Sequence, residues 1–406
     1  MSEQTTTRKK ATGTTRAPSV ILARDLQVLG YDLWLNDLTD EVHNGEKRFD
    51  DVARAVLEMQ LRDRGYAGAM LGAISPGVIA QAAKQRRHPM REYLDTLTWD
   101  GDDHIAQLSG YISCAGTPIL YPDGTQRTAF HAFFRRWMVG AVAKIRGDGD
   151  ACRGNFVLTL AGRQGAGKSH LASWLCPNPA WFIDKGVNPD DKDDRVKRST
   201  VLVWEIGELG ATTKRADVEA LKGFITAPTV SERKAYGRTD TQKPAIASYI
   251  GTVNSSGFLA DDTGNRRFAV ADVAAIDWAY TKVNRRQMWA QAVALWNADS
   301  TSWRLSEQEV VHRDEANRAH GVVTAVGEAL SRAFTPDSND KQEWNGLEIL
   351  DKLRLFGGLM AGGDDNRRLR ELAGALRDWG IEVERKWDKD TGKTQRVYIG
   401  LTRVKV

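Results

Sequence analysis

The sequence element that most restricts the fold is the octapeptide at residues 162–169, Gly-Arg-Gln-Gly-Ala-Gly-Lys-Ser. An apolar, β-prone run at residues 155–161 precedes it, and residues 169–175, which follow it, have the apolar spacing of a helix. The pattern G-x-x-x-x-G-K-[ST] between a strand and a helix is typical of a loop whose backbone N–H groups surround a phosphate. It predicts an α/β core built on a parallel sheet.

The chemistry of such a loop assigns a role to each of its last residues. Lys168 can reach the β and γ phosphates of a nucleotide, and the Ser169 hydroxyl can hold Mg²⁺. The alternative is a glycine-rich turn that matches the pattern by chance. The candidate nucleotide-binding residues are Gly162, Gln164, Gly165, Ala166, Gly167, Lys168, Ser169 and His170.

Two acidic residues follow the next buried strand. Residues 200–204 form a continuous apolar run, as expected for a strand covered on both faces, and Glu205 stands at its end with Glu208 three residues later. Ligands of open parallel sheets bind beyond the carboxyl ends of the strands, where these carboxylates could hold Mg²⁺ or orient the attacking water. In the alternative interpretation, either glutamate is simply solvated.

Three further polar residues are candidates for a catalytic role. Asn254 ends a predicted strand at residues 245–253 and could hydrogen-bond a γ-phosphate or water, or it could merely cap a turn. Arg266 and Arg267 follow in a polar turn before another apolar strand. A guanidinium group suits bidentate contact with a transferring phosphoryl group, although one arginine of such a pair could be structural.

A basic segment with one aromatic residue lies between these motifs. Residues 226–243 form a predicted hairpin, in which cations could neutralise phosphates of DNA and a ring could stack on bases. An exposed polar loop or a contact between subunits is the alternative. The candidate DNA-binding residues are Arg233, Lys234, Tyr236 and Arg238.

Length and composition indicate several packed domains. The chain of 406 residues is longer than one hydrophobic core usually supports, and its 41% hydrophobic and 27% charged residues are ordinary for globular domains. A net charge of +4 permits a polyanionic partner without requiring one. We predict a disordered tail (1–20), a helical N-terminal domain (21–120), an ATPase core (121–320) and a C-terminal domain (321–406).

The C-terminal domain has its own pattern. Three helical segments, at residues 322–334, 347–355 and 366–379, precede a hairpin formed by residues 381–387 and 394–399. This order is typical of a winged helix, whose third helix can enter the major groove of DNA. A winged helix that serves only protein contacts is the alternative.

Cysteine usage and hydropathy indicate a soluble protein. Cys114, Cys152 and Cys176 have no metal-ligand spacing and do not form an even set for disulfides, which fits a reducing compartment. The first twenty residues lack the apolar centre of a signal peptide, and no later stretch is long and apolar enough for a bilayer. We expect a cytoplasmic protein without a membrane partner.

With these motifs assembled, the chain resembles the virulence-associated E family of phage and mobile-element replication proteins, which is similar to superfamily 3 helicases of the AAA+ class. The resemblance covers about residues 93–296. Its most specific parts are W-D-G (99–101), the phosphate loop, W-E-I-G-E-L (204–209), F-I-T (224–226), Y-G-R (236–238), G-T-V-N (251–254) and T-G-N-R-R-F (263–268).

The resemblance implies a P-loop AAA+ core that uses ATP and Mg²⁺. Lys168 and Ser169 would bind nucleotide and metal, and Glu205 with Glu208 would supply the second acidic motif, Glu205 as a metal ligand. Asn254 would be the sensor residue.

The resemblance further implies that Arg266 or Arg267 acts as a finger on the γ-phosphate of a neighbouring subunit. The protein would therefore form a ring of identical copies, expected to be a hexamer, in the cytoplasm of a bacterial host. Two features depart from the pattern: two residues separate the acidic pair, which is adjacent in the usual AAA+ motif, and no dense acidic cluster precedes Gly101. We therefore predict no primer synthesis by this chain, and a primase or polymerase is a candidate partner.

Two functions follow from these inferences. In the first, the protein is an ATP-driven helicase or translocase that unwinds DNA, single-stranded or forked, during replication. In the second, it is an ATP-switched initiator or regulator that binds DNA without processive unwinding. The basic hairpin favours the motor, and the winged helix fits both.

Overall fold

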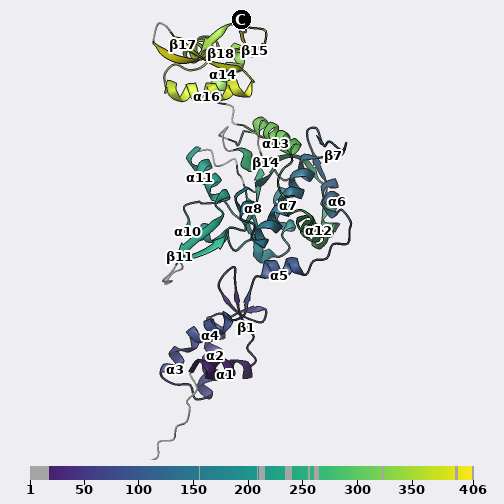
Figure 1. Ribbon diagram of the computed structural model, residues 1–406, viewed down its shortest axis with the longest axis vertical. Helices are drawn as coiled ribbons and strands as arrows, with labels where there is room; N and C mark the ends of the chain where they lie inside the picture. The colour runs from purple at the N-terminus through teal and green to yellow at the C-terminus, as the bar shows by residue number, and fades with distance from the viewer. Residues whose placement is uncertain are drawn as a thin grey trace, which may run out of the picture. The chain divides into compact units, whose positions relative to one another are not determined.

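The computed structural model describes residues 18–154, 156–207, 209, 215–233, 240–254, 257–259, 265–321, 324–388 and 392–404 (Figure 1). Residues 1–17 of the predicted tail lie outside this set. The chain divides into two compact units, residues 1–97 and 98–406, and each is considered by itself. Residues 98–120, which the sequence analysis assigns to the N-terminal domain, belong to the second unit.

The N-terminal unit combines helices with a small sheet that the sequence analysis did not predict. Its four strands have the order β3-β2-β1-β4, with β1 and β4 parallel. Apolar residues of β1 and the helices, among them Leu26, Leu57 and Ile74, form its core. The elements are α1 (Pro18–Val28), β1 (Leu33–Asn36), β2 (Val42–Asn44), β3 (Lys47–Arg48), α2 (Asp51–Asp63), α3 (Ala69–Gly72), α4 (Ile74–Ala82), β4 (Arg86–Arg87) and α5 (Pro89–Asp95).

A mostly parallel six-stranded sheet forms the centre of the second unit. The strand order is β5-β14-β8-β13-β10-β9, and only the edge pair β5/β14 is antiparallel. β8, β10 and β13 are buried along their whole length, as their apolar sequences predict. The strands are β5 (Ile112–Cys114), β8 (Val157–Ala161), β9 (Phe182–Asp184), β10 (Val203–Ile206), β13 (Ser248–Val253) and β14 (Phe268–Ile276).

Helix α7 (Ala129–Arg146) is the main buried support of this sheet. It contacts β5, β8, β13 and β14, and most of its 18 residues are buried. The indole N–H of Trp137 donates to the Tyr249 carbonyl of β13 (2.9 Å) and the Lys144 ammonium to the Ala247 carbonyl (2.7 Å). Its apolar residues recur at helical spacing in the sequence, at Phe130, Phe133, Phe134 and Trp137.

The remaining helices of the second unit connect and flank the strands. Two helices, η4 and α12, follow β14. Val283 and Asn284 separate them, and the Asn284 side chain caps α12. These helices are α6 (His104–Gly110), α8 (Gly149–Gly154), α9 (Lys168–Leu175), α10 (Lys192–Lys197), α11 (Arg215–Thr226), α12 (Arg285–Ala298), α13 (Glu307–Ala319) and the 3₁₀ helices η1 (Pro179–Trp181), η3 (Asn265–Arg267) and η4 (Trp278–Lys282).

Two short hairpins complete this part of the unit. β11 (Thr229–Arg233) and β12 (Asp240–Pro244) pair antiparallel, so the predicted hairpin is confirmed in its strands. β6 (Ile119–Leu120) and β7 (Gln126–Arg127) form the other hairpin. No helix among the described residues is long and apolar enough to cross a membrane.

The C-terminal segment has the predicted order of three helices and a hairpin. A third strand, β16, pairs with β18, so the small sheet has the order β16-β18-β17. The helices share one core with β15, β16, β18 and β19. The elements are α14 (Ala325–Ala333), β15 (Phe334–Pro336), β16 (Glu343–Asn345), α15 (Gly346–Phe356), α16 (Asp365–Asp378), β17 (Glu382–Asp388), β18 (Lys393–Ile399) and β19 (Leu401–Arg403).

Candidate active site

The loop at residues 162–167 joins β8 to α9, as the sequence predicts. The Gly162 N–H donates to the Val253 carbonyl of β13 (3.1 Å), which ties the start of the loop to the neighbouring strand. A Cβ atom on Gly162 would lie 2.3 Å from the Val273 carbonyl oxygen of β14, so this position has no room for a side chain. Gly167 has φ +91°, a left-handed conformation that other residues rarely adopt.

Helix α9 presents an uncapped N-terminus to this loop. Gly167 occupies the N-cap position, and no side chain hydrogen-bonds to the first N–H groups of the helix among the described residues. Ser169 and His170, in the first turn, are exposed. Free N–H groups and the positive end of the helix dipole favour an anion at this place.

Lys168 lies folded back over the loop. Its ammonium donates to the carbonyls of Gly162 (2.7 Å) and Arg163 (2.8 Å) and to Asn254 Oδ1 (3.0 Å). Its residue is 5% exposed, and burial lowers the pKa of the ammonium. The structure therefore brings two of the predicted site residues, Lys168 and Asn254, into direct contact.

Asn254 reaches this position from β13, which lies between β8 and β10. Val253 pairs with Ala161, so both strands end at the same edge of the sheet and Asn254 follows directly. The Asn254 side chain is exposed at this edge apart from its contact with Lys168. An amide here can face whatever the loop binds.

Glu205 belongs to β10 and is almost fully buried, with 1% of the residue exposed. The predicted strand at residues 200–204 is shifted, so Glu205 lies inside the strand instead of after it. Thr252 Oγ1 of β13 donates to Glu205 Oε1 (3.1 Å). Glu205 Oε2 has no hydrogen-bond partner of standard geometry among the described residues.

Burial raises the pKa of the Glu205 carboxyl group, and the nearby Asp184 carboxylate adds to the effect. The hydroxyls of Ser169 and Thr252 act in the opposite direction. A cation placed beside the unpartnered oxygen would favour the charged carboxylate. Ser169 and Glu205 are therefore residues that could hold a divalent cation.

Asp184 is a residue that the sequence analysis missed. It ends β9 and pairs in register with Glu205. Asp184 has the same signal in the sequence as Glu205, because it also ends an apolar strand of the parallel sheet.

An aromatic group lies beside the first turn of α9. His170 Nδ1 is 2.5 Å from the Tyr280 hydroxyl, and its ring centroid is 4.8 Å from that of Trp278. The Trp278 ring also borders the loop, since a Cβ atom on Gly167 would be 3.2 Å from it. Trp278 and Tyr280, from η4, were not predicted as site residues, because only the folded chain brings η4 to the loop.

Arg266 and Arg267 lie away from this group. They form the end of η3, directly before β14, where Phe268 pairs with Val157 at the start of β8. The loop follows the other end of β8, so the arginines and the loop lie at opposite ends of the parallel strands. A five-residue strand separates them by about 16 Å.

Helix α13 holds the arginine turn in place. The Asn317 amide donates to the carbonyls of Asn265 (2.7 Å) and Phe268 (3.0 Å), and Arg313 to the Arg266 carbonyl (3.4 Å). Arg266 is exposed and Arg267 half-buried. Neither side chain meets Lys168 or Glu205 within this chain.

Of the remaining predicted site residues, the structure places Arg233 alone among the described residues. Glu208, Lys234, Tyr236 and Arg238 lie outside the described residues. Arg233 is the last residue of β11, at the end of the hairpin that leads to the basic segment.

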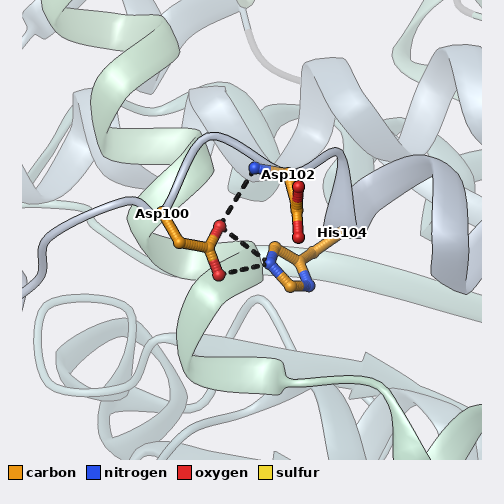
Figure 2. A group of neighbouring side chains, drawn as sticks. All are labelled: Asp100, Asp102 and His104. Carbon is orange, nitrogen blue, oxygen red and sulfur yellow. Dashed lines mark hydrogen bonds and ion pairs between the residues drawn. The ribbon is translucent and has the colours of Figure 1, made fainter.

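The W-D-G motif at residues 99–101 opens a second polar group. Figure 2 shows the Asp100 carboxylate facing His104, whose Nε2 lies 3.0 and 2.9 Å from its two oxygens. The Asp102 N–H also donates to Asp100 Oδ1 (3.0 Å). Asp100, Asp102 and His104 offer ligand atoms within 4.8 Å of one another, but their mutual hydrogen bonds already account for this turn.

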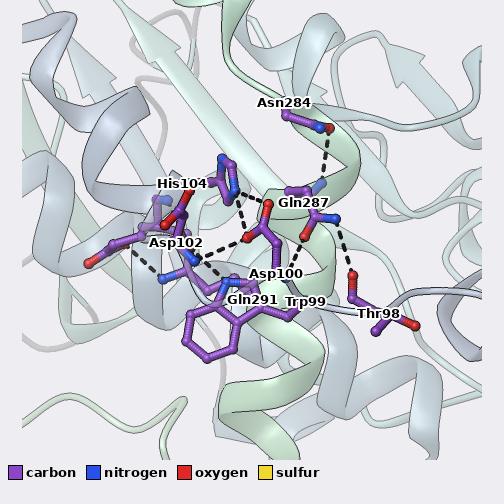
Figure 3. Close-up of polar contacts among 10 residues, drawn as sticks. Thr98, Trp99, Asp100, Asp102, His104, Asn284, Gln287 and Gln291 are labelled. Carbon is purple, nitrogen blue, oxygen red and sulfur yellow. Dashed lines mark hydrogen bonds and ion pairs between the residues drawn. The ribbon is translucent and has the colours of Figure 1, made fainter.

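This turn is fastened to α12, as Figure 3 shows. Gln287 accepts from the Asp100 N–H (3.1 Å) and donates to the Thr98 carbonyl (3.1 Å). Gln291 accepts from the Ile105 N–H (2.9 Å) and donates to Asp103 Oδ1 (2.8 Å). The W-D-G motif is thus explained as an anchor between the first and last parts of the α/β core.

Comparisons with known proteins agree with this architecture. Residues 94–322 match the model of the virulence-associated protein E-like domain, more than half of the chain. Among solved structures, the apo structure of the NrS-1 C-terminal region is similar with a TM-score of 0.50 and 13% identity, covering 95% of this chain and 100% of that one. The A form of the same region gives a TM-score of 0.49 at 12% identity, with the same coverage. No curated protein matches the chain.

Proposed function

Because this chain belongs to the virulence-associated protein E-like family, we propose that it is an ATP-dependent DNA helicase or translocase of phage or mobile-element replication. Its α/β core would be a P-loop ATPase of the AAA+, superfamily 3 type, acting as a ring of identical copies. The observation that carries the proposal is the meeting of Lys168, Asn254 and the Ser169–Glu205 pair at the carboxyl edge of three adjacent strands.

ATP would bind with its phosphates over the loop and the N-terminus of α9. Lys168 now donates to two loop carbonyls, and anionic phosphate oxygens are stronger acceptors for its ammonium. Lys168 would therefore exchange these contacts for the β and γ phosphates. Gly162 and Gly167 allow the backbone to approach the phosphates closely.

Ser169 and Glu205 are the residues that would hold Mg²⁺, which would neutralise phosphate charge when bound. Glu205 Oε2 is buried without a partner of standard geometry among the described residues, and Ser169 lies beside this carboxyl group. Hard oxygen donors of this kind suit Mg²⁺. Thr252 orients Glu205 through its hydroxyl.

Hydrolysis requires a water molecule that attacks the γ-phosphorus while the bond to the β-phosphate oxygen breaks, which releases ADP and phosphate. Asn254, exposed at the strand edge beside Lys168, is suited to orient that water through its amide. A carboxylate, Glu205 or Glu208, would accept the proton. Arg266 or Arg267 would contact the γ-phosphate of a neighbouring copy. Within their own chain, both lie at the end of the parallel strands opposite to the phosphate loop.

DNA contacts would come from two places. The β11/β12 hairpin leads to Lys234, Tyr236 and Arg238, which can contact the phosphates and bases of a single strand. The C-terminal segment has the helix and strand order of a winged helix, which supports a duplex contact.

Strand displacement on a forked DNA duplex tests the proposal. The full chain should displace a strand with ATP and Mg²⁺, whereas Lys168→Ala and Glu205→Gln should bind DNA and displace none. If the wild type hydrolyses ATP and binds DNA but displaces no strand with either tail polarity, the helicase proposal fails. That result would favour the ATP-switched initiator or regulator. The winged-helix order of the C-terminal segment is also compatible with that function.

A further inference from the structure

Trp278 is an unusually placed aromatic residue. It is the first residue of η4, directly beyond the carboxyl end of β14, and it is 54% exposed. Single exposed apolar side chains are common on protein surfaces, so the position of Trp278, and not its exposure alone, is what matters here. Its ring lies against the last glycine of the phosphate loop, 3.2 Å from where a Cβ of Gly167 would be.

Two other aromatic side chains contact the Trp278 ring. His170 meets it edge-on at 4.8 Å between centroids, with an angle of 62° between the planes. Tyr280, which is buried, stacks beside it at 6.3 Å and hydrogen-bonds to His170. Asp277 begins η4 by accepting from the Ala279 N–H (2.9 Å), while its own N–H donates to the Tyr111 carbonyl (2.9 Å).

We propose that Trp278, supported by His170, is the surface on which the base of the bound nucleotide stacks. The inference rests on the proposed function, because it assumes that the loop holds the phosphates. The base must then extend from the N-terminus of α9, and Trp278 and His170 offer the aromatic surface at that place. Stacking recognises the π-face that all bases share, so the site accepts both adenine and guanine nucleotides.

A different use of the same ring is a contact with a DNA base. The position of Trp278 favours the nucleotide, because its ring contacts the loop itself, whereas the basic segment follows the β11/β12 hairpin. Binding of single-stranded DNA by wild type and Trp278→Ala, measured beside nucleotide binding, separates the two.

Calorimetric titration of the full chain with ADP, GDP and inorganic pyrophosphate, each with Mg²⁺, tests the inference. Trp278→Ala should raise the Kd of ADP and GDP about tenfold or more, as loss of one base–aromatic stack does, and leave pyrophosphate unchanged. Trp278→Phe should recover most of the affinity. Leu120→Ala, which removes a 60% exposed apolar side chain of β6, should leave all three ligands unaffected.

The results separate failure of the inference from failure of the proposed function. If the wild type binds neither ADP nor pyrophosphate, the nucleotide site itself is wrong. If ADP binds to Trp278→Ala as tightly as to the wild type, only the stacking surface is wrong. An equal loss for ADP and pyrophosphate would mean that Trp278 merely supports the loop, and weakened single-stranded DNA binding with normal ADP affinity would assign the ring to DNA.

Discussion

Lys168 Nζ lies 3.0 Å from Asn254 Oδ1, which joins the phosphate loop to the end of the neighbouring strand β13. Among the described residues, the Lys168 ammonium donates to this amide oxygen and to the loop carbonyls of Gly162 and Arg163. On the proposed function, a phosphate bound by the loop would compete for the same ammonium, and the Asn254 amide would then face the ligand. The two residues would in that case couple phosphate binding at the loop to the orientation of the Asn254 amide.

Replacing Asn254 should separate binding from hydrolysis. Asn254→Ala leaves the loop carbonyl contacts of Lys168 intact, so nucleotide affinity should change little. Hydrolysis should fall about 10²-fold, as it does when one positioned hydrogen-bonding group is lost from an active site. Asn254→Asp should instead weaken nucleotide binding, because a carboxylate would pair with Lys168 and repel the phosphates. ATPase rates and Kd values for ADP measured side by side would check both; an unchanged hydrolysis rate in Asn254→Ala would contradict the proposed role.

The arginine pair should act on a neighbouring copy. Arg266→Ala or Arg267→Ala should bind ATP normally and lose hydrolysis, because these residues lie at the opposite edge of the sheet from their own loop. A mixture with Lys168→Ala should regain activity, since some interfaces then combine an intact loop with an intact finger. Arg304→Ala, a change at a surface ion pair, is the control and should resemble the wild type. Failure of rescue at every mixing ratio argues against a shared site.

Two loop glycines should differ in their tolerance of alanine. At Gly165 a Cβ meets no atom within 4 Å, and only the left-handed φ of +77° opposes it, at a cost of about 1–2 kcal/mol. At Gly162 the Cβ would be 2.3 Å from the Val273 carbonyl oxygen, so the backbone must move, which adds about 1–3 kcal/mol. Thermal unfolding should therefore show a larger decrease in stability for Gly162→Ala than for Gly165→Ala. An equal or smaller decrease for Gly162→Ala would show that the loop is not held against β14.

Lys144 should make stability depend on alkaline pH. Burial lowers the pKa of its ammonium from 10.5 to about 8, although it donates to the Ala247 carbonyl. Because the folded state releases this proton more easily than the unfolded state, the unfolded chain binds more protons between about pH 8 and 10.5, and stability from this group rises across that window. The free energy of unfolding should increase by about 3 kcal/mol across this window, because a difference of one pKa unit corresponds to about 1.36 kcal/mol.

Lys144→Met removes this titration. The difference in unfolding free energy between variant and wild type should therefore shift in favour of the wild type as the pH rises from 8 to 10.5. Lys341→Met, at an exposed lysine, provides the matched comparison and should show no such trend. If the free energies of unfolding of wild type and Lys144→Met changed in parallel with pH, the lowered pKa of Lys144 would be contradicted.

The basic segment between β11 and β12 should determine the salt dependence of DNA binding. Each of Lys234→Ala and Arg238→Ala should reduce the slope of log K against log salt by about one, since each removes one phosphate contact. The exposed Lys341, changed to alanine, should leave the slope unchanged. Filter binding of single-stranded DNA at several salt concentrations measures it, and an unaltered slope in the hairpin variants would exclude phosphate contacts by these side chains.

The sequence alone predicts the parts of the site that follow from local rules. Strand–loop–helix spacing identified the loop, and polar residues at the ends of apolar runs identified Glu205 and Asn254. The structure then placed them on adjacent strands, in contact or within electrostatic reach of Lys168 and Ser169. The DNA-binding and catalytic roles of these residues stay predictions.

Other features depend on contacts that no local pattern contains. Trp278 reaches the loop only because β14 pairs beside β8. The N-terminal sheet was missed because its strands have two to four residues, too short for a clear alternation. Lys144 lies on a helix buried nearly all round, whereas its charge suggests a solvent-facing position.

The anchor between residues 98–105 and α12 determines how the protein can be shortened. Gln287 and Gln291 hydrogen-bond to residues almost 190 positions earlier in the chain. An expression fragment that starts at residue 121 would lack this anchor and β5, and would expose the edge of β14 and polar groups of α12 to solvent. We therefore expect that a fragment which keeps the α/β core intact begins no later than Thr98.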